Sequence, residues 1–105
     1  SLEDQTDDLG LRLDDLQLSF DQAERRIART LLNLAAQYGR PCPEGVRISI
    51  RFTHQDVAGI INTSRITTNK VMKRMEEEGI LLKREGRYIL RALPALERLA
   101  RGEGQ

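Results

Sequence analysis

The sequence predicts an α+β fold that is mostly α, in which a helical core carries small antiparallel β-hairpins. Three observations lead to this prediction. Apolar residues recur at helical spacing over most of the chain, alternation of apolar and polar residues is confined to short stretches, and glycine or proline separates these patterns. The length of 105 residues allows one small domain with one modest core.

The first segment, residues 1–19, carries a helix-like apolar stripe that Gly10 weakens. Residues 1–24 hold eight acidic residues and one basic residue, a net charge of −7. We expect this acidic helix to pack on its own domain or on a second subunit, and the stripe is too short to predict a coiled coil. The stripe consists of Leu9, Leu13, Leu16 and Phe20.

A core helix is predicted over residues 22–38. Asp21 and Glu24 are spaced as a capping box at its start, and Gly39 and Pro41 end it. Arginines fall on or near its outer face. The inward face consists of Ile27, Ala28, Leu31, Leu32, Leu34, Ala35 and Tyr38.

After this helix the pattern changes to a period of two. Arg40–Gly45 is rich in proline and glycine, which predicts a loop. Residues 46–52 alternate apolar and polar side chains, which predicts a half-buried strand with a basic outer face. The predicted inward residues are Val46, Ile48, Ile50 and Phe52.

Two short helices joined by a tight turn are predicted from Thr53 onward. Thr53 and Asp56 form a variant capping box, in which Asp replaces the preferred Glu. Asn62 tolerates the left-handed backbone of a tight turn, and Ser64 offers a new N-cap. The second helix is predicted over residues 65–78. The first is predicted to bury Val57, Ile60 and Ile61.

The second helix has an outer face suited to DNA. Arg65, Asn69 and Lys70 are side-chain types that reach base edges in the major groove. Ile66 also lies off the core stripe, and two interpretations stay open: contact with a thymine methyl group, or packing against a neighbouring loop. Gly79 ends the helix. The predicted inward residues are Thr68, Val71, Met72 and Met75.

A β-hairpin is predicted over residues 80–90, with Glu85 and Gly86 in its turn. A basic hairpin directly after such a helix is a wing, able to contact flanking phosphates. Pro94 then suits the start of a short closing helix. The fold predicted is therefore a winged helix-turn-helix. The basic residues of the wing are Lys83, Arg84 and Arg87.

The sequence lacks the residues that a metal site, an enzyme active site or a membrane span would need. Cys42 is the only cysteine and His54 the only histidine, so we expect no disulfide, metal site or cofactor in this chain. No Ser/His/Asp or Cys/His set and no glycine-rich phosphate loop point to an enzyme. No apolar run is long enough for a membrane span and no signal peptide opens the chain, so a cytoplasmic protein is expected. A chain that begins with Ser is expected to be a fragment.

The charge of the remaining chain favours an anionic partner. Residues 25–105 hold sixteen basic and eight acidic residues, a net charge of +8. Double-stranded DNA is the first candidate, and ordinary solvated surface charge is the alternative that charge alone leaves open. A winged helix used for protein–protein contact is the main competing function. It should show acidic or apolar residues on the second helix, where this chain shows mainly basic ones.

Residues 20–90 resemble the DNA-binding domain of the CRP/FNR family of bacterial transcription regulators. The resemblance rests on Arg26–Ala35, on Val46–Phe52, and on the combination of Thr53-His-Gln-Asp-Val-Ala with Thr63-Ser-Arg-Ile-Thr. It implies a homodimer that binds an inverted-repeat operator. It also implies a sensing domain absent from this chain, whose effector is unknown, and contact with RNA polymerase in activators. Residues 1–19 then resemble the end of the dimerisation helix or its linker, residues 20–101 the DNA-binding domain, and residues 102–105 a tail.

The resemblance also implies roles for single residues. Arg65 falls on the position that commonly reads guanine, whereas Ile66 and Lys70 replace the Glu and second Arg of the cyclic-AMP-responsive branch. The pair Arg65–Ile66 is more similar to the nitrogen-control regulators. Four residues fall on positions that contact phosphates or support the recognition helix: His54, Gln55, Ser64 and Thr67. The complete set of predicted phosphate contacts is Thr53, His54, Gln55, Ser64, Thr67, Lys73, Lys83, Arg84 and Arg87.

Overall fold

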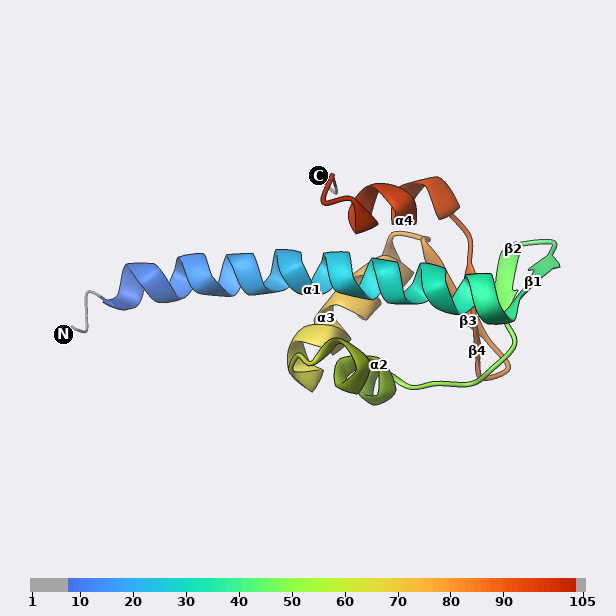
Figure 1. Ribbon diagram of the computed structural model, residues 1–105, viewed down its shortest axis with the longest axis horizontal. Coiled ribbons are helices and arrows are strands. Elements are labelled where there is room, and N and C mark those ends of the chain that lie inside the picture. The colour runs from blue at the N-terminus through green and yellow to red at the C-terminus, as the bar shows by residue number, and fades with distance from the viewer. Residues whose placement is uncertain (1–7, 104–105) are drawn as a thin grey trace.

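The computed structural model describes residues 8–103, with side chains from Phe20 onward. Within this range, four helices and one four-stranded antiparallel sheet, ordered β1-β2-β4-β3, form the predicted winged helix-turn-helix (Figure 1). The elements are α1 (Asp8–Tyr38), β1 (Gly39–Cys42), β2 (Gly45–Ile48), α2 (His54–Ile61), α3 (Arg65–Glu77), β3 (Leu81–Arg84), β4 (Arg87–Leu90) and α4 (Leu93–Ala100). The parts of the predicted first segment and tail at residues 1–7 and 104–105 lie outside the described residues.

The first helix differs from the prediction, because α1 is one continuous helix of 31 residues. The capping box expected at Asp21 and Glu24 is wrong: both residues lie inside the helix, and Glu24 is buried with 7% of its surface exposed. No proline interrupts residues 8–38, and a single glycine costs only about 1 kcal/mol in a helix. Extending an existing helix is also easier than nucleating a new one.

The second correction concerns the segment after α1. Residues 39–48 form a β-hairpin, in which β1 pairs with β2 from Gly39–Ile48 to Cys42–Gly45, where a loop was expected. Pro41 is tolerated because β1 is an edge strand, whose outer side needs no ladder hydrogen bond. The predicted strand 46–52 ends at Ile48, and Ile50 is exposed rather than inward. Phe52 is buried as predicted, although it follows the strand.

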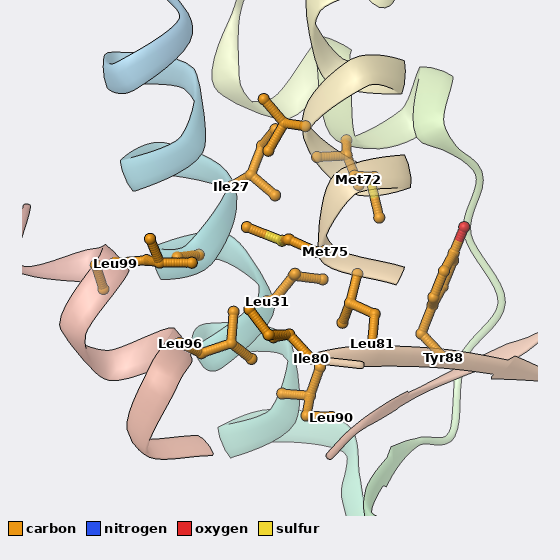
Figure 2. Close-up of a cluster of buried hydrophobic side chains, with 14 of the residues drawn as sticks. Ile27, Leu31, Met72, Met75, Ile80, Leu81, Tyr88, Leu90, Leu96 and Leu99 are labelled. Carbon is orange, nitrogen blue, oxygen red and sulfur yellow. The ribbon is translucent and has the colours of Figure 1, made fainter. Parts of the chain in front are cut away.

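The core lies between α1, α3, α4 and the inner face of the sheet (Figure 2). Ile27 and Leu31 of α1 meet Met72 and Met75 of α3 in this cluster. The closing helix α4 has Pro94 in its first turn, as predicted. It adds Leu96, Leu99 and Ala100 to the core. These contacts hold α3 against α1 through one face and leave its other face outside.

Candidate nucleic-acid interface

The first helix of the helix-turn-helix starts with the predicted capping box. The Thr53 hydroxyl accepts a hydrogen bond from the Asp56 backbone N–H at 3.1 Å, and the Asp56 carboxylate accepts one from the Thr53 N–H at 2.9 Å. Both orphan donors of the helix start are therefore satisfied, although the acid is Asp rather than Glu. Asn62 ends α2 in the left-handed conformation, with φ 58°, as the turn prediction required.

One predicted core residue of α2 is wrong. Ile60 is 61% exposed, and Ala58 takes the inward place beside Val57 and Ile61. At roughly 100° of rotation per residue, the face shared by Val57, Ala58 and Ile61 points about a quarter turn away from Ile60. Spacing alone could not choose between the two faces of so short a helix.

Ser64 fixes the start of α3. Its hydroxyl accepts from the Thr67 backbone N–H at 3.0 Å and donates to the Thr67 hydroxyl at 3.0 Å. The buried hydroxyl of Thr68 donates to the Ser64 carbonyl at 2.9 Å. The predicted N-cap is thus confirmed, and Ser64 and Thr67 already bond to each other at the helix end where phosphate contact is predicted.

The two faces of α3 differ sharply in burial. Thr68, Val71, Met72 and Met75 are buried, as predicted. Arg65, Ile66, Asn69, Lys70 and Lys73 are all exposed, so the structure gathers the predicted base-reading residues on one surface. Ile66 is 66% exposed, so no loop among the described residues covers it. An exposed isoleucine among cationic and amide side chains suits a surface that meets the apolar methyl groups of DNA.

His54 connects α2 to the exposed face of α3. Its Nδ1 lies 2.9 Å from Oδ1 of Asn69, and its Nε2 lies 3.7 Å from a carboxylate oxygen of Glu76. The ring also stacks on Tyr88 of β4, with centroids 6.3 Å apart. Sequence reasoning missed this cluster, because its members are up to 34 residues apart and no local pattern links them.

Tyr88 supports this cluster from the sheet. It is buried and stacks on Phe52, with ring centroids 5.0 Å apart. Burial and the neighbouring Glu76 carboxylate raise the pKa of Tyr88 to about 12. The phenol therefore keeps its proton at physiological pH and donates toward Glu76.

The wing is the predicted hairpin. Glu85 and Gly86 both have positive φ, 55° and 80°, which matches a two-residue turn of the kind that suits hairpin twist. Lys83 pairs with Tyr88 across the hairpin, and its ammonium lies 5.4 Å from the centroid of the Tyr88 ring. Because side chains alternate along a strand, Lys83 lies on the opposite face of the wing from Arg84.

The two arginines of the wing have partners within the chain. Arg84 pairs with the carboxylate of Glu44, in the turn between β1 and β2. Arg87 donates through Nε to the Ser49 carbonyl at 2.8 Å. Arg84 therefore joins the wing to the turn between β1 and β2, and Arg87 joins it to the residue that follows β2. Their role in phosphate binding, like that of Thr53 and Gln55, stays a prediction.

Arg51 is a basic residue near the wing that the sequence did not single out. It follows β2, is exposed, and its guanidinium end lies against Gly86, where a Cβ would meet Arg51 Nε at 3.3 Å. The alternation of residues 46–52 marked its charge but not its position, because that position depends on the chain leaving the sheet after Ile48. Arg51 adds a positive charge beside the wing turn.

Two other kinds of feature are absent from the described residues, a cluster of metal ligands and a helix that could span a membrane. No three His, Cys, Asp or Glu side chains gather among them at metal-binding distance. No helix in the described range is long and apolar enough to cross a membrane.

The characterised proteins that this chain resembles in sequence include regulators. The chain is 33% identical over 95 residues to a cyclic AMP receptor protein of Thermus thermophilus, covering 88% of this chain and 41% of that protein. It is 37% identical over 65 residues to the cAMP-activated global transcriptional regulator CRP of Salmonella typhimurium, covering 61% and 30%. A global nitrogen regulator of Synechocystis is 30% identical over 56 residues, covering 53% and 25%. The chain thus spans less than half the length of these relatives.

Solved structures of other proteins contain a domain with the same fold as this chain. The CO-dependent transcription factor CooA from Carboxydothermus hydrogenoformans matches with a TM-score of 0.72 and 24% identity, covering 79% of this chain and 38% of that one. A CRP-family transcriptional regulator from Thermus thermophilus matches with a TM-score of 0.65 and 28% identity, covering 88% and 49%.

A family model agrees with the fold and with these relatives. The model described as a Crp-like helix-turn-helix domain matches residues 25–99, which include α2, α3 and the wing. The family and its regulator relatives support a DNA-binding output domain of a transcription regulator. The chain belongs to the family of Crp-like helix-turn-helix domains.

Proposed function

We propose that this domain reads the sequence of double-stranded DNA by placing α3 in the major groove and the wing on flanking phosphates. The observation that carries the proposal is the division of α3 into a buried apolar face and an exposed face with Arg65, Ile66, Asn69 and Lys70. Arg reaches guanine, and an aliphatic side chain meets the thymine methyl group. A protein-binding helix would offer a less cationic surface at this place.

Phosphate contacts would frame this reading surface. The N-terminal end of α3 favours an anion through its helix dipole, and Lys73 lies farther along the exposed side. On the wing, Lys83 is exposed on the face that carries Tyr88, and Arg51 adds its charge at the turn. Such contacts position a protein on the duplex without selecting a sequence.

We further propose that residues 1–19 are the end of a dimerisation helix in a longer regulator, and that two domains bind an inverted repeat. The N-terminal half of α1 runs beyond the rest of the fold (Figure 1). Its apolar stripe is the feature that a partner helix would cover. We also propose that this regulator acts in the cytoplasm and that, as an activator, it would contact RNA polymerase.

The test is selection from a randomised duplex library at near-physiological salt, followed by sequencing of the retained DNA. Enrichment of an inverted repeat with half-sites about one helical turn apart would support both sequence reading and a bound dimer. A single enriched half-site would support reading by a monomer and contradict dimerisation by this chain. A folded protein that enriches no sequence would contradict the proposal and favour a protein-contact module.

A further inference from the structure

The contact between His54 and Asn69 fixes a side chain on the reading surface. His54 is the first residue of α2, and Asn69 lies on the exposed face of α3. Nδ1 of His54 faces Oδ1 of Asn69 at 2.9 Å. A ring nitrogen that faces an amide oxygen must carry its proton, so Nδ1–H donates and Oδ1 accepts.

The histidine ring is itself held in place. Its Nε2 lies 3.7 Å from Glu76, and its face stacks on Tyr88. Glu76 is seven residues after Asn69, so both lie on the side of α3 that faces α2. Both ring nitrogens therefore face side chains of α3.

We propose that His54 is a positioning residue that sets which atoms Asn69 presents to DNA; this inference rests on the proposed reading of DNA by α3. A free asparagine reads adenine with both ends of its amide, accepting from N6 and donating to N7. With Oδ1 turned to His54, the outward end of Asn69 is its NH₂ group, which only donates. Asn69 therefore selects a base edge that only accepts, such as O6 and N7 of guanine.

This inference changes the role expected for His54. A phosphate contact would strengthen binding to every sequence equally, whereas a positioning role acts on one base pair in each half-site. The two roles therefore differ in a quantity that can be measured, which is the base preference at the position read by Asn69.

The experiment is library selection with the unaltered chain, with His54→Phe, with Asn69→Ala and with the double variant. Phenylalanine keeps the stacking on Tyr88 and removes the donor. We expect His54→Phe, which frees the amide of Asn69, to move the preference at one base pair toward adenine, and Asn69→Ala to lose roughly tenfold of the preference at that same base pair. The double variant should match Asn69→Ala, because His54 acts only through Asn69. Thermal unfolding of each variant confirms that the fold is kept.

A second variant tests the atoms directly. Asn69→Asp keeps an oxygen facing His54 and replaces the outward NH₂ group with an acceptor, so the preference should move toward cytosine, whose N4 donates. Glu77→Gln, an exposed change outside the cluster, is the matched control and should leave the preference unchanged.

Three outcomes would overturn the inference. His54→Phe could weaken all sequences alike and reduce the salt dependence, which would make His54 a phosphate contact. Asn69→Asp could keep the original base preference, which would remove Asn69 from base reading. In both cases the unaltered chain still enriches a motif, so the proposed function stands. If the unaltered folded chain enriches nothing, the proposed function fails and this inference fails with it.

Discussion

Arg65 is exposed at the first turn of α3, next to the exposed Ile66. On the proposed function, Arg65→Ala should cost about 1–3 kcal/mol in binding to the selected sequence and much less in binding to a scrambled duplex, because a base contact is lost. Titration of both duplexes at one salt concentration measures the difference. Arg98→Ala, the same change on the exposed side of α4, is the control. Equal losses on both duplexes would contradict a base contact by Arg65.

Glu24 is a buried acid between α1 and α3. Burial raises its pKa above 4.5, while Arg74 lowers it and Asp21 and Glu78 raise it further. A folded pKa above the unfolded value means that the folded state binds the proton more tightly. The contribution of Glu24 to the free energy of unfolding therefore falls as pH rises from about 4.5 through the raised pKa.

Glu24→Gln removes this titration. We expect the variant to gain stability relative to the unaltered protein as pH increases over that window, measured by urea unfolding at several pH values. A difference that stays constant from pH 4 to pH 7 would show that Glu24 does not titrate differently in the folded state.

Single residues were predictable where the signal is local. Thr53 and Ser64 lie at helix starts, where each side chain bonds the backbone three residues on, and Asn62 ends α2 with its left-handed backbone. Each has the role that the sequence predicted. The pairs His54–Asn69 and Glu44–Arg84 join residues 15 and 40 positions apart. Such pairs depend on how the elements pack, so one sequence gives no sign of them.

At the scale of elements, replacing two glycines by alanine should have opposite effects on stability, because helix propensity decides one case and close packing the other. Gly59 lies inside α2 with open space where a Cβ would stand, so Gly59→Ala should stabilise the fold by about 0.5–1 kcal/mol. At Gly39 a Cβ would meet the Ala35 carbonyl oxygen at 2.2 Å, so Gly39→Ala should destabilise the junction of α1 and β1. Chemical denaturation compares the pair. Similar changes in stability would contradict the tight junction.

The wing gives a prediction about salt. Lys83→Gln should weaken binding to all sequences alike and reduce the slope of log K against log salt by about one, because one phosphate contact is lost. Arg84→Gln should change the slope less, since Glu44 already pairs with Arg84. Binding measured at four or five salt concentrations gives both slopes. An unchanged slope for Lys83→Gln would remove Lys83 from the contacts.

Elements with strong periodicity or turn signals were predicted well, and β1 was not. The sequence of β1, Gly-Arg-Pro-Cys, has neither alternation nor strand-forming residues. It becomes a strand because β2 lies beside it and the two-residue turn at Pro43 and Glu44 brings them together. β1 is therefore a strand because of its pairing with β2 and not because of the strand propensity of its residues. The predicted strand 46–52 is too long because alternation continues past Ile48 while the pairing with β4 is limited to Val46 and Arg47.

At the scale of the whole molecule, the fold class followed from the order of elements, and the extent of α1 did not. The sequence predicts a helix start near Asp21, because an acid at that position resembles an N-cap. The packing of α1 against α2, α3 and α4 favours one helix through that point. The boundary predicted between residues 19 and 20 therefore falls inside a continuous helix, and backbone hydrogen bonds of that helix connect the two segments.

A continuous α1 also acts as a lever. At 1.5 Å per residue, 31 residues span about 46 Å, so a tilt of roughly 10° at one end moves the other by about 8 Å. The DNA major groove is about 12 Å wide. The C-terminal half of α1 packs directly on the helix that is proposed to enter that groove. Small rotations imposed far from the DNA would therefore be enough to bring two such helices into register with successive grooves, or to take them out of it.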